Sequence, residues 1–159
     1  MCAWAGWGSN HPTLLCGPLT RAGKARLPLA ADQTRSTMEL SPAVPILRIF
    51  SVEKAREFYL DFLGFTLDWE HRFSEDMPLY MQITRSGLRL HLSEHYGDST
   101  PGSAVFIPTE DIDALHQELS ARQYRYARPG VETLDWGKEL NLTDPFGNRL
   151  RFCQQIGDA

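Results

Sequence analysis

The sequence lacks any apolar run near the roughly 18 residues that a membrane-spanning helix needs, so we expect no membrane span. Cysteine is scarce. The three cysteines have no zinc-ribbon spacing and are too few for a disulfide framework, which favours a reducing, cytoplasmic location. The glycines form no phosphate-cradling loop, and no arrangement typical of a catalytic nucleophile is present.

Basic residues are fewer than acidic ones, 16 against 20, so the net charge is −4. Residues 1–37 carry +3, which leaves −7 for the rest of the chain. An acidic body repels phosphate backbones, so nucleic acid is not an expected partner. It would attract cationic small molecules, although solubility alone also explains such a charge.

The first 37 residues differ in character from the rest. They are rich in Gly, Pro, Ala and Arg and follow neither helical nor strand periodicity. They do not resemble a secretory signal, and a transit peptide is a conceivable alternative. We expect a disordered N-terminal extension over 1–37, with Met38 as the natural start of a domain over 38–159.

From Ala43 onward the pattern becomes regular. Ser51 is a good helix N-cap, Gly64 a good helix terminator, and Ser86-Gly87 a hairpin turn. The expected elements are a strand over 43–50, a helix over 52–63, a strand over 65–73 and a hairpin over 78–94.

The same order recurs after the linker at 95–102. The expected elements are a strand over 103–109, a helix over 110–123, a short strand within 124–137 and a hairpin over 138–154. The sequence therefore predicts an α+β fold of two βαβββ modules, 43–94 and 103–155, forming a curved sheet cleft. Each sheet has one apolar face to cover, which favours a homodimer.

Two motifs point to a known family. "FYLDFLGF" at 58–65 and "DPFGNRLRF" at 144–152 resemble the paired signatures of the vicinal oxygen chelate superfamily. That superfamily includes glyoxalase I, extradiol dioxygenases, fosfomycin-modifying enzymes and bleomycin resistance proteins. The resemblance covers residues 43–155 and implies the modular fold described above.

The resemblance also implies four metal-ligand positions, one on the first and one on the last strand of each module. Counted from the motifs, they fall on Val44, His91, Ala104 (or its neighbour Ser103) and Arg151. Val, Ala and Arg cannot ligate a divalent metal, so we expect no metal and no cofactor. Bleomycin resistance proteins share this deficiency, and they resemble this chain in having a Trp-Gly pair, here Trp136-Gly137, before the final hairpin.

We therefore expect a metal-free protein that sequesters a cationic, aromatic antibiotic or a comparable metabolite without altering it. No residue is assigned a catalytic role. The candidate ligand-binding residues are His91, Trp136, Arg151, Trp69, Phe73, Tyr80, Phe106 and Glu94.

Each candidate also has a structural interpretation. Arg151 could instead pair with Glu94 or Glu139, His91 could hydrogen-bond a backbone carbonyl, and the aromatic residues could belong to the core.

Two other functions remain open from the sequence. A glyoxalase-like lyase or isomerase, or a dioxygenase-related enzyme, would combine His91 with metal ligands from elsewhere, of which His71, Glu94 and His95 are the nearest. A regulatory module would instead use the fold to bind a partner protein.

Overall fold

The structure is a computed structural model that describes residues 38–155. The predicted extension over 1–37 lies outside the described residues and stays a prediction. The first module consists of β1 (Ile46–Arg48), α1 (Val52–Ala55), the π-helix η1 (Arg56–Phe62), β2 (Thr66–His71), β3 (Tyr80–Arg85) and β4 (Leu88–Ser93). The second consists of β5 (Ala104–Pro108), α2 (Ile112–Ala121), β6 (Val131–Leu134), β7 (Gly137–Thr143) and β8 (Arg149–Gln155).

The two modules have the same sheet topology. The strand order is β1-β4-β3-β2 in one four-stranded sheet and β5-β8-β7-β6 in the other. In each sheet the first strand pairs parallel with the last, and the remaining pairs are antiparallel. The predicted α+β fold with two βαβββ modules is confirmed.

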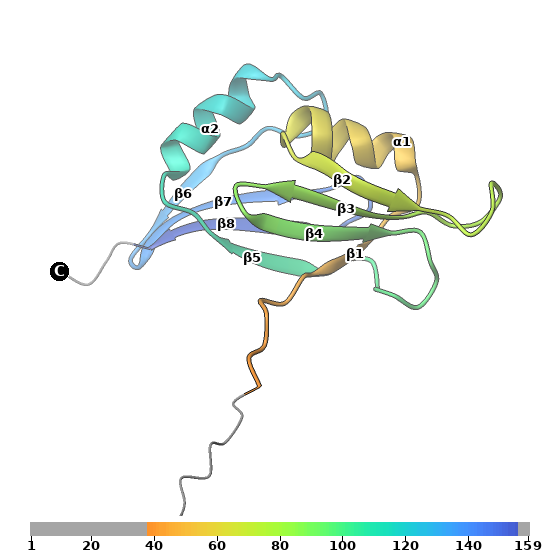
Figure 1. Cartoon of the computed structure of the whole chain (residues 1–159). Helices are drawn as coiled ribbons and strands as arrows, with labels where there is room; N and C mark the ends of the chain where they lie inside the picture. The colour runs from red at the N-terminus through yellow and green to blue at the C-terminus, as the bar shows by residue number, and fades with distance from the viewer. Residues whose placement is uncertain (1–37, 156–159) are drawn as a thin grey trace, which may run out of the picture. The chain divides into compact units, whose positions relative to one another are not determined.

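Each sheet has a buried face and an open face. Leu90 and Leu92 of β4 are fully buried, whereas the alternating residue His91 is not, because successive side chains of a strand point to opposite sides. Figure 1 shows both helices on the same side of the strands. The helices and the buried faces of both sheets contribute to one hydrophobic core. The opposite face is called the open face below.

The first helix departs from the predicted α-helix. Ser51 caps it as expected and Gly64 ends it with a φ of +72°, but Arg56–Phe62 form a π-helix. The Leu63 N–H donates to the carbonyl of Phe58, five residues back. Helical periodicity in the sequence predicts a helix, but it does not distinguish the hydrogen bonds of a π-helix from those of an α-helix.

The two motif segments meet in the core. The Tyr59 hydroxyl donates to Oδ2 of Asp144 over 2.7 Å, which joins the first helix to the β7–β8 turn. The same carboxylate accepts from the Phe146 N–H at 2.9 Å and from the Asn148 N–H and Nδ2 at 2.7 Å each. Asp144 and Asn148 are buried, so these hydrogen bonds satisfy groups that water cannot reach. Both motifs therefore hold the modules together.

Candidate functional site

A row of side chains crosses the open face of the first sheet. The strand register places Ile46, His91, Gln82 and Trp69 side by side on β1, β4, β3 and β2. A β-bulge after Leu67 shifts the register of β2.

His91 is held in a hydrogen-bond chain along this row. Its Nδ1 lies 2.8 Å from the Tyr80 hydroxyl, and its Nε2 lies 2.9 Å from Oε1 of Gln82. The Gln82 Nε2 donates to the Asp68 carboxylate at 2.8 Å, which fixes the orientation of the amide. Oε1 of Gln82 is then an acceptor, so His91 carries its proton on Nε2 and accepts from Tyr80 on Nδ1.

These hydrogen bonds determine whether His91 could ligate a metal ion. Both ring nitrogens are engaged, which leaves no lone pair for a metal ion. Burial lowers the pKa of His91 from its ordinary value of 6.5, and the nearby Arg89 lowers it further, so the neutral form is favoured. The alternative interpretation, a hydrogen bond from His91 to a backbone carbonyl, is wrong, because its partners are the side chains of Tyr80 and Gln82.

Aromatic side chains gather beside His91. The Trp69 and Tyr80 rings are stacked with centroids 6.0 Å apart, and the Trp69 ring meets His91 edge-on at 5.6 Å. Trp69 and Tyr80 line a groove of about 390 Å³, together with His71, Phe73, His95 and Asp98. Trp69 is 43% exposed and Phe73 is 75% exposed, so a ligand could contact both rings. The structure thus brings together Trp69, Phe73, Tyr80 and His91 as candidate site residues.

The corresponding row on the second sheet contains Phe106, Arg151 and Asn141. Arg151 donates from Nε to Oε1 of Glu139 over 2.8 Å and from Nη2 to Oε2 over 2.9 Å. Arg151 and Glu139 line a groove of about 380 Å³. The hydrogen bond from Arg151 lowers the pKa of Glu139 despite the opposing effect of burial. The structural interpretation of Arg151 is therefore confirmed, with Glu139 as the partner.

Two candidates lie apart from these grooves. Glu94 accepts from the Leu79 N–H at 2.9 Å and lies 3.6 Å from Arg72, so its carboxylate is used within the loop region after β4. Trp136 occupies the tight turn between β6 and β7 and is 42% exposed. Within residues 38–155, neither Glu94 nor Trp136 lines the Trp69 groove. Neither makes a hydrogen bond or a ring contact with Trp69 or Arg151.

The register shows which residues pair with His91 and Arg151. Ile46 lies beside His91 and Phe106 lies beside Arg151. Ile46 and Phe106 cannot ligate a divalent metal any more than Val44 and Ala104 can, so His91 is the one ligand type at these positions and the residues do not fit a divalent metal. Within residues 38–155, no group of three or more His, Cys, Asp or Glu side chains could hold a metal ion, which does not support the alternative set of His71, Glu94 and His95.

Sequence reasoning missed Gln82 and Asp68 as site residues. Gln82 shares the alternation of Tyr80 along β3, which is a signal that it faces the same side. That signal did not reveal which residue of β4 it meets. Asp68 has no comparable signal in the sequence, yet it accepts hydrogen bonds from both Gln82 and Thr84.

No helix within residues 38–155 is long and apolar enough to cross a membrane.

The modular fold and the open sheet faces are those of the vicinal oxygen chelate class. The sequence matches the family described as "Glyoxalase superfamily protein" over residues 29–158. The chain therefore belongs to the glyoxalase superfamily. Comparison with the curated proteins gives no match.

Solved structures give further similarity. The bleomycin-binding protein of bleomycin-producing Streptomyces verticillus, solved with copper(II)-bleomycin, is 32% identical and has a TM-score of 0.54, covering 76% of this chain and 99% of its own. The antibiotic-binding protein TnmS3 of Streptomyces sp. CB03234 is 23% identical with a TM-score of 0.59, covering 74% of this chain and 98% of its own. The bleomycin resistance determinant of transposon Tn5 is 21% identical with a TM-score of 0.58, covering 74% of this chain and 100% of its own. The last two similarities concern the fold alone.

Proposed function

We propose that this protein binds a small organic molecule on its open face and releases it unchanged. The observation that carries the proposal is the donor set at the chelate positions: one fully hydrogen-bonded His91, two apolar residues and a guanidinium. Without a metal ligand set, the Lewis-acid chemistry of the superfamily has no support here. The similarity to a bleomycin-binding protein at 32% identity supports a binding function.

The groove favours a planar ligand with a positive charge. The exposed Trp69–Tyr80 stack offers a flat surface for an aromatic ring, worth about 0.5–1.5 kcal/mol beyond burial. Asp98 places a carboxylate in the same groove. The chain as a whole carries a net charge of −4, which attracts a cation over distance. The proposed ligand is therefore a cationic, aromatic antibiotic or a metabolite of similar chemistry.

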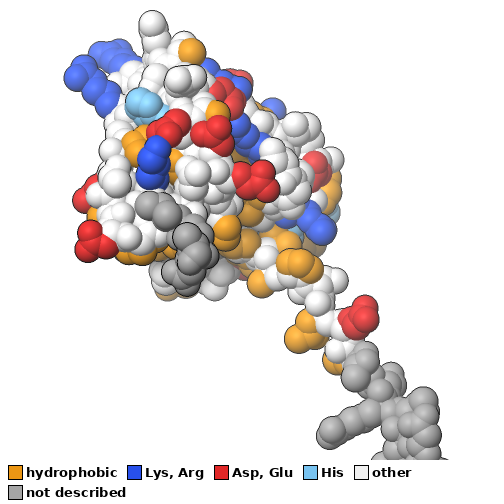
Figure 2. Space-filling model, turned by 90° about the vertical axis from the view of Figure 1, so that its left-hand side faces the viewer, with side chains coloured by type: hydrophobic (Ala, Val, Ile, Leu, Met, Phe, Trp, Pro, Cys, Tyr) orange, Lys and Arg blue, Asp and Glu red, His pale blue; other side chains and the backbone are white. Residues whose placement is uncertain are grey.

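The open face also supports the proposal of a homodimer. Large apolar side chains there have no cover within the described residues: Ile46 is 37% exposed, Trp69 is 43% exposed and Phe106 is 50% exposed. Figure 2 shows hydrophobic side chains along the lower margin of the body, on the side away from the helices. A second subunit facing this surface would cover Ile46 and Phe106 and complete two ligand grooves in which Trp69 stays accessible to the ligand. Light scattering should give about twice the chain mass of 18.0 kDa.

Titration calorimetry with bleomycin tests the binding function. We expect one site per chain at micromolar protein, and mass spectrometry of the recovered ligand should show its mass unchanged. Absence of binding would remove bleomycin as the ligand, and a changed mass would favour an enzyme. Stoichiometric Ni, Zn, Fe or Mn in the purified protein would also favour the enzyme.

A further inference from the structure

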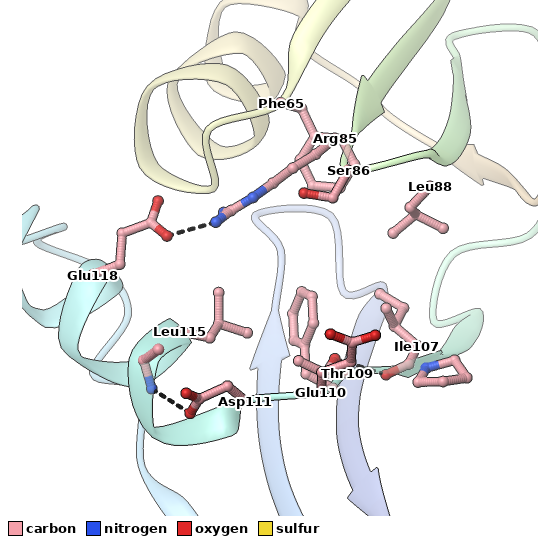
Figure 3. Close-up of a pocket in the computed structure, with 13 residues that line it drawn as sticks. Phe65, Arg85, Ser86, Leu88, Ile107, Thr109, Glu110, Asp111, Leu115 and Glu118 are labelled. Atoms are coloured by element: carbon pink, nitrogen blue, oxygen red, sulfur yellow. Dashed lines mark hydrogen bonds and ion pairs between the residues drawn. The ribbon is translucent and has the colours of Figure 1, made fainter.

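A further cavity lies away from the open face. It has a volume of about 570 Å³ and opens on the core side, at the boundary between the modules. Figure 3 shows Phe65, Arg85 and Leu88 of the first module on one side of it and Ile107, Leu115 and Glu118 of the second on the other. Since none of the proposed ligand-binding residues lines it, it is a separate site from the Trp69 groove.

The floor of this cavity is apolar. Phe65, Ile107 and Phe152 are 5%, 7% and 7% exposed, whereas core residues such as Phe58 and Leu150 are 0% exposed. Their residual exposure is consistent with the open space beside them. Cavities of 300–1,000 Å³ with an apolar lining and a few polar groups are typical small-molecule sites.

Charged groups at the rim set the kind of ligand. Arg85 donates to Oε2 of Glu118 at 2.6 Å, and Arg122 donates to Oε1 of the same residue at 2.7 Å, so Glu118 is fully neutralised. Asp111 is engaged as the N-cap of α2. The exposed carboxylate of Glu110 makes no hydrogen bond or ion pair with any residue of 38–155. Arg85 and Arg122 carry +2 and Glu110, Asp111 and Glu118 carry −3, so the rim is net negative, and Glu110 is its carboxylate without a partner within residues 38–155.

We propose that this cavity binds an amphipathic organic cation. Its apolar ring or short chain lies against Phe65, Ile107 and Phe152, and its protonated amine faces Glu110. A ligand in this position contacts both modules and stabilises their packing, because it binds the folded state only. The site does not depend on the proposed function of the open face.

Three probes with the same apolar body test the charge requirement: 4-phenylbutylamine, 4-phenylbutanol and 4-phenylbutyrate. In ¹H–¹⁵N NMR titrations we expect the amine to shift the amides of Ile107 and Leu115 and to bind at least 10-fold more tightly than the acid. The amide of Gln82, on the open face, should not shift. Equal binding of amine and acid, shifts confined to the open face, or no binding at millimolar probe would each overturn the proposal.

Two variants test the location. Ala114 is exposed on α2 and lines the cavity, so Ala114→Trp fills the space without changing the core, and the amine should lose at least 10-fold in affinity. Gln117→Trp, on an exposed position of the same helix outside the cavity, is the matched control. Glu110→Gln should weaken the amine about 10-fold and leave the alcohol unchanged, whereas Glu53→Gln should affect neither. Undiminished amine binding by Ala114→Trp would contradict the assigned site.

Discussion

Arg151 and Glu139 form a bidentate ion pair in which the carboxylate is 3% exposed and the guanidinium stays accessible. The cation on the open face of β8 therefore neutralises a buried carboxylate of β7. Nη1 of Arg151 takes no part in the pair and remains available to a ligand carbonyl or carboxylate. A structural and a ligand-binding role are thus compatible in one residue.

The pair predicts a pH dependence of stability. The pKa of Glu139 is held below its ordinary value of 4.5 in the folded protein. Its contribution is therefore fully present above pH 4.5 and is lost as the pH falls through the lower, folded value. We expect Glu139→Gln to destabilise the protein at pH 7 and the difference from wild type to shrink toward pH 3, as measured by chemical unfolding. For the exposed Glu75→Gln, the difference from wild type in the free energy of unfolding should not change with pH. If this difference stayed constant from pH 7 to pH 3 for Glu139→Gln, the proposed coupling between the Glu139 carboxylate and stability would be contradicted.

The His91 chain predicts one tautomer. Long-range ¹H–¹⁵N NMR should show neutral His91 with its proton on Nε2 at pH 6.5, because the folded pKa lies below that value. As the pH falls below 6.5, His91 gains a second proton in the unfolded chain before it does so in the folded protein. The free energy of unfolding therefore decreases until the pH has passed the folded pKa. Asp68→Ala frees the Gln82 amide to rotate, and a mixture of tautomers should appear. A single Nδ1–H tautomer in the wild type would contradict this assignment, because His91 would then donate to Tyr80 and accept from Gln82.

Trp69 is predicted to be a ligand contact rather than a core residue. Trp69→Leu should reduce bleomycin affinity about 10-fold, equivalent to ~1.4 kcal/mol, by calorimetry. The midpoint of thermal unfolding should change little, because the side chain is 43% exposed. Tyr96→Leu is the control, since Tyr96 is 98% exposed and lines no groove described above. Equal affinities for wild type and Trp69→Leu would remove the aromatic groove from the proposal.

Local patterns predicted the elements, because alternation and helical spacing are properties of single segments. The hairpin through Ser86-Gly87 is an example: both residues have positive φ, of 48° and 82°, as the sequence suggested for a tight turn. The repeat of the element order was equally visible and gave the two sheets their identical topology.

Register was not predictable in the same way. Placing Ile46 rather than Val44 beside His91 requires knowing how β1 pairs with β4, and no single strand carries that information. The bulge after Leu67 is likewise hidden in the sequence, although Asp68 beside it completes the His91 chain. The residue types of the candidate site were therefore predictable and their contacts were not.

The contact between the two motifs predicts a coupled loss of stability. Tyr59→Phe removes the hydrogen bond to the buried Asp144 carboxylate and should cost about 1.5–3 kcal/mol in the free energy of unfolding. Asp144→Ala should cost more, because it also leaves the Phe146 and Asn148 N–H groups without their acceptor. A double-mutant cycle between Tyr59 and Asp144 should give a coupling energy above about 0.5 kcal/mol.

Tyr124→Phe is the control for this cycle. Its ring stacks on Phe62 at 4.7 Å, and its hydroxyl makes no hydrogen bond within residues 38–155, so the change should stay within about 0.5 kcal/mol. Additive effects of Tyr59→Phe and Asp144→Ala would mean that the motifs stabilise the fold independently.

Gly137 is predicted to be required by close packing of strands rather than by ligand binding. A Cβ atom at this position would lie 2.2 Å from the backbone oxygen of Gln154 on β8. Backbone cannot yield as a flexible side chain does, so Gly137→Ala should cost about 2–3 kcal/mol by chemical unfolding. Gly130→Ala is the matched control, since its Cβ would meet nothing within 4 Å and its φ is not positive. That variant should be neutral or stabilised by up to about 1 kcal/mol. Similar stabilities for the two variants would show that the β7–β8 pair can separate to admit a methyl group.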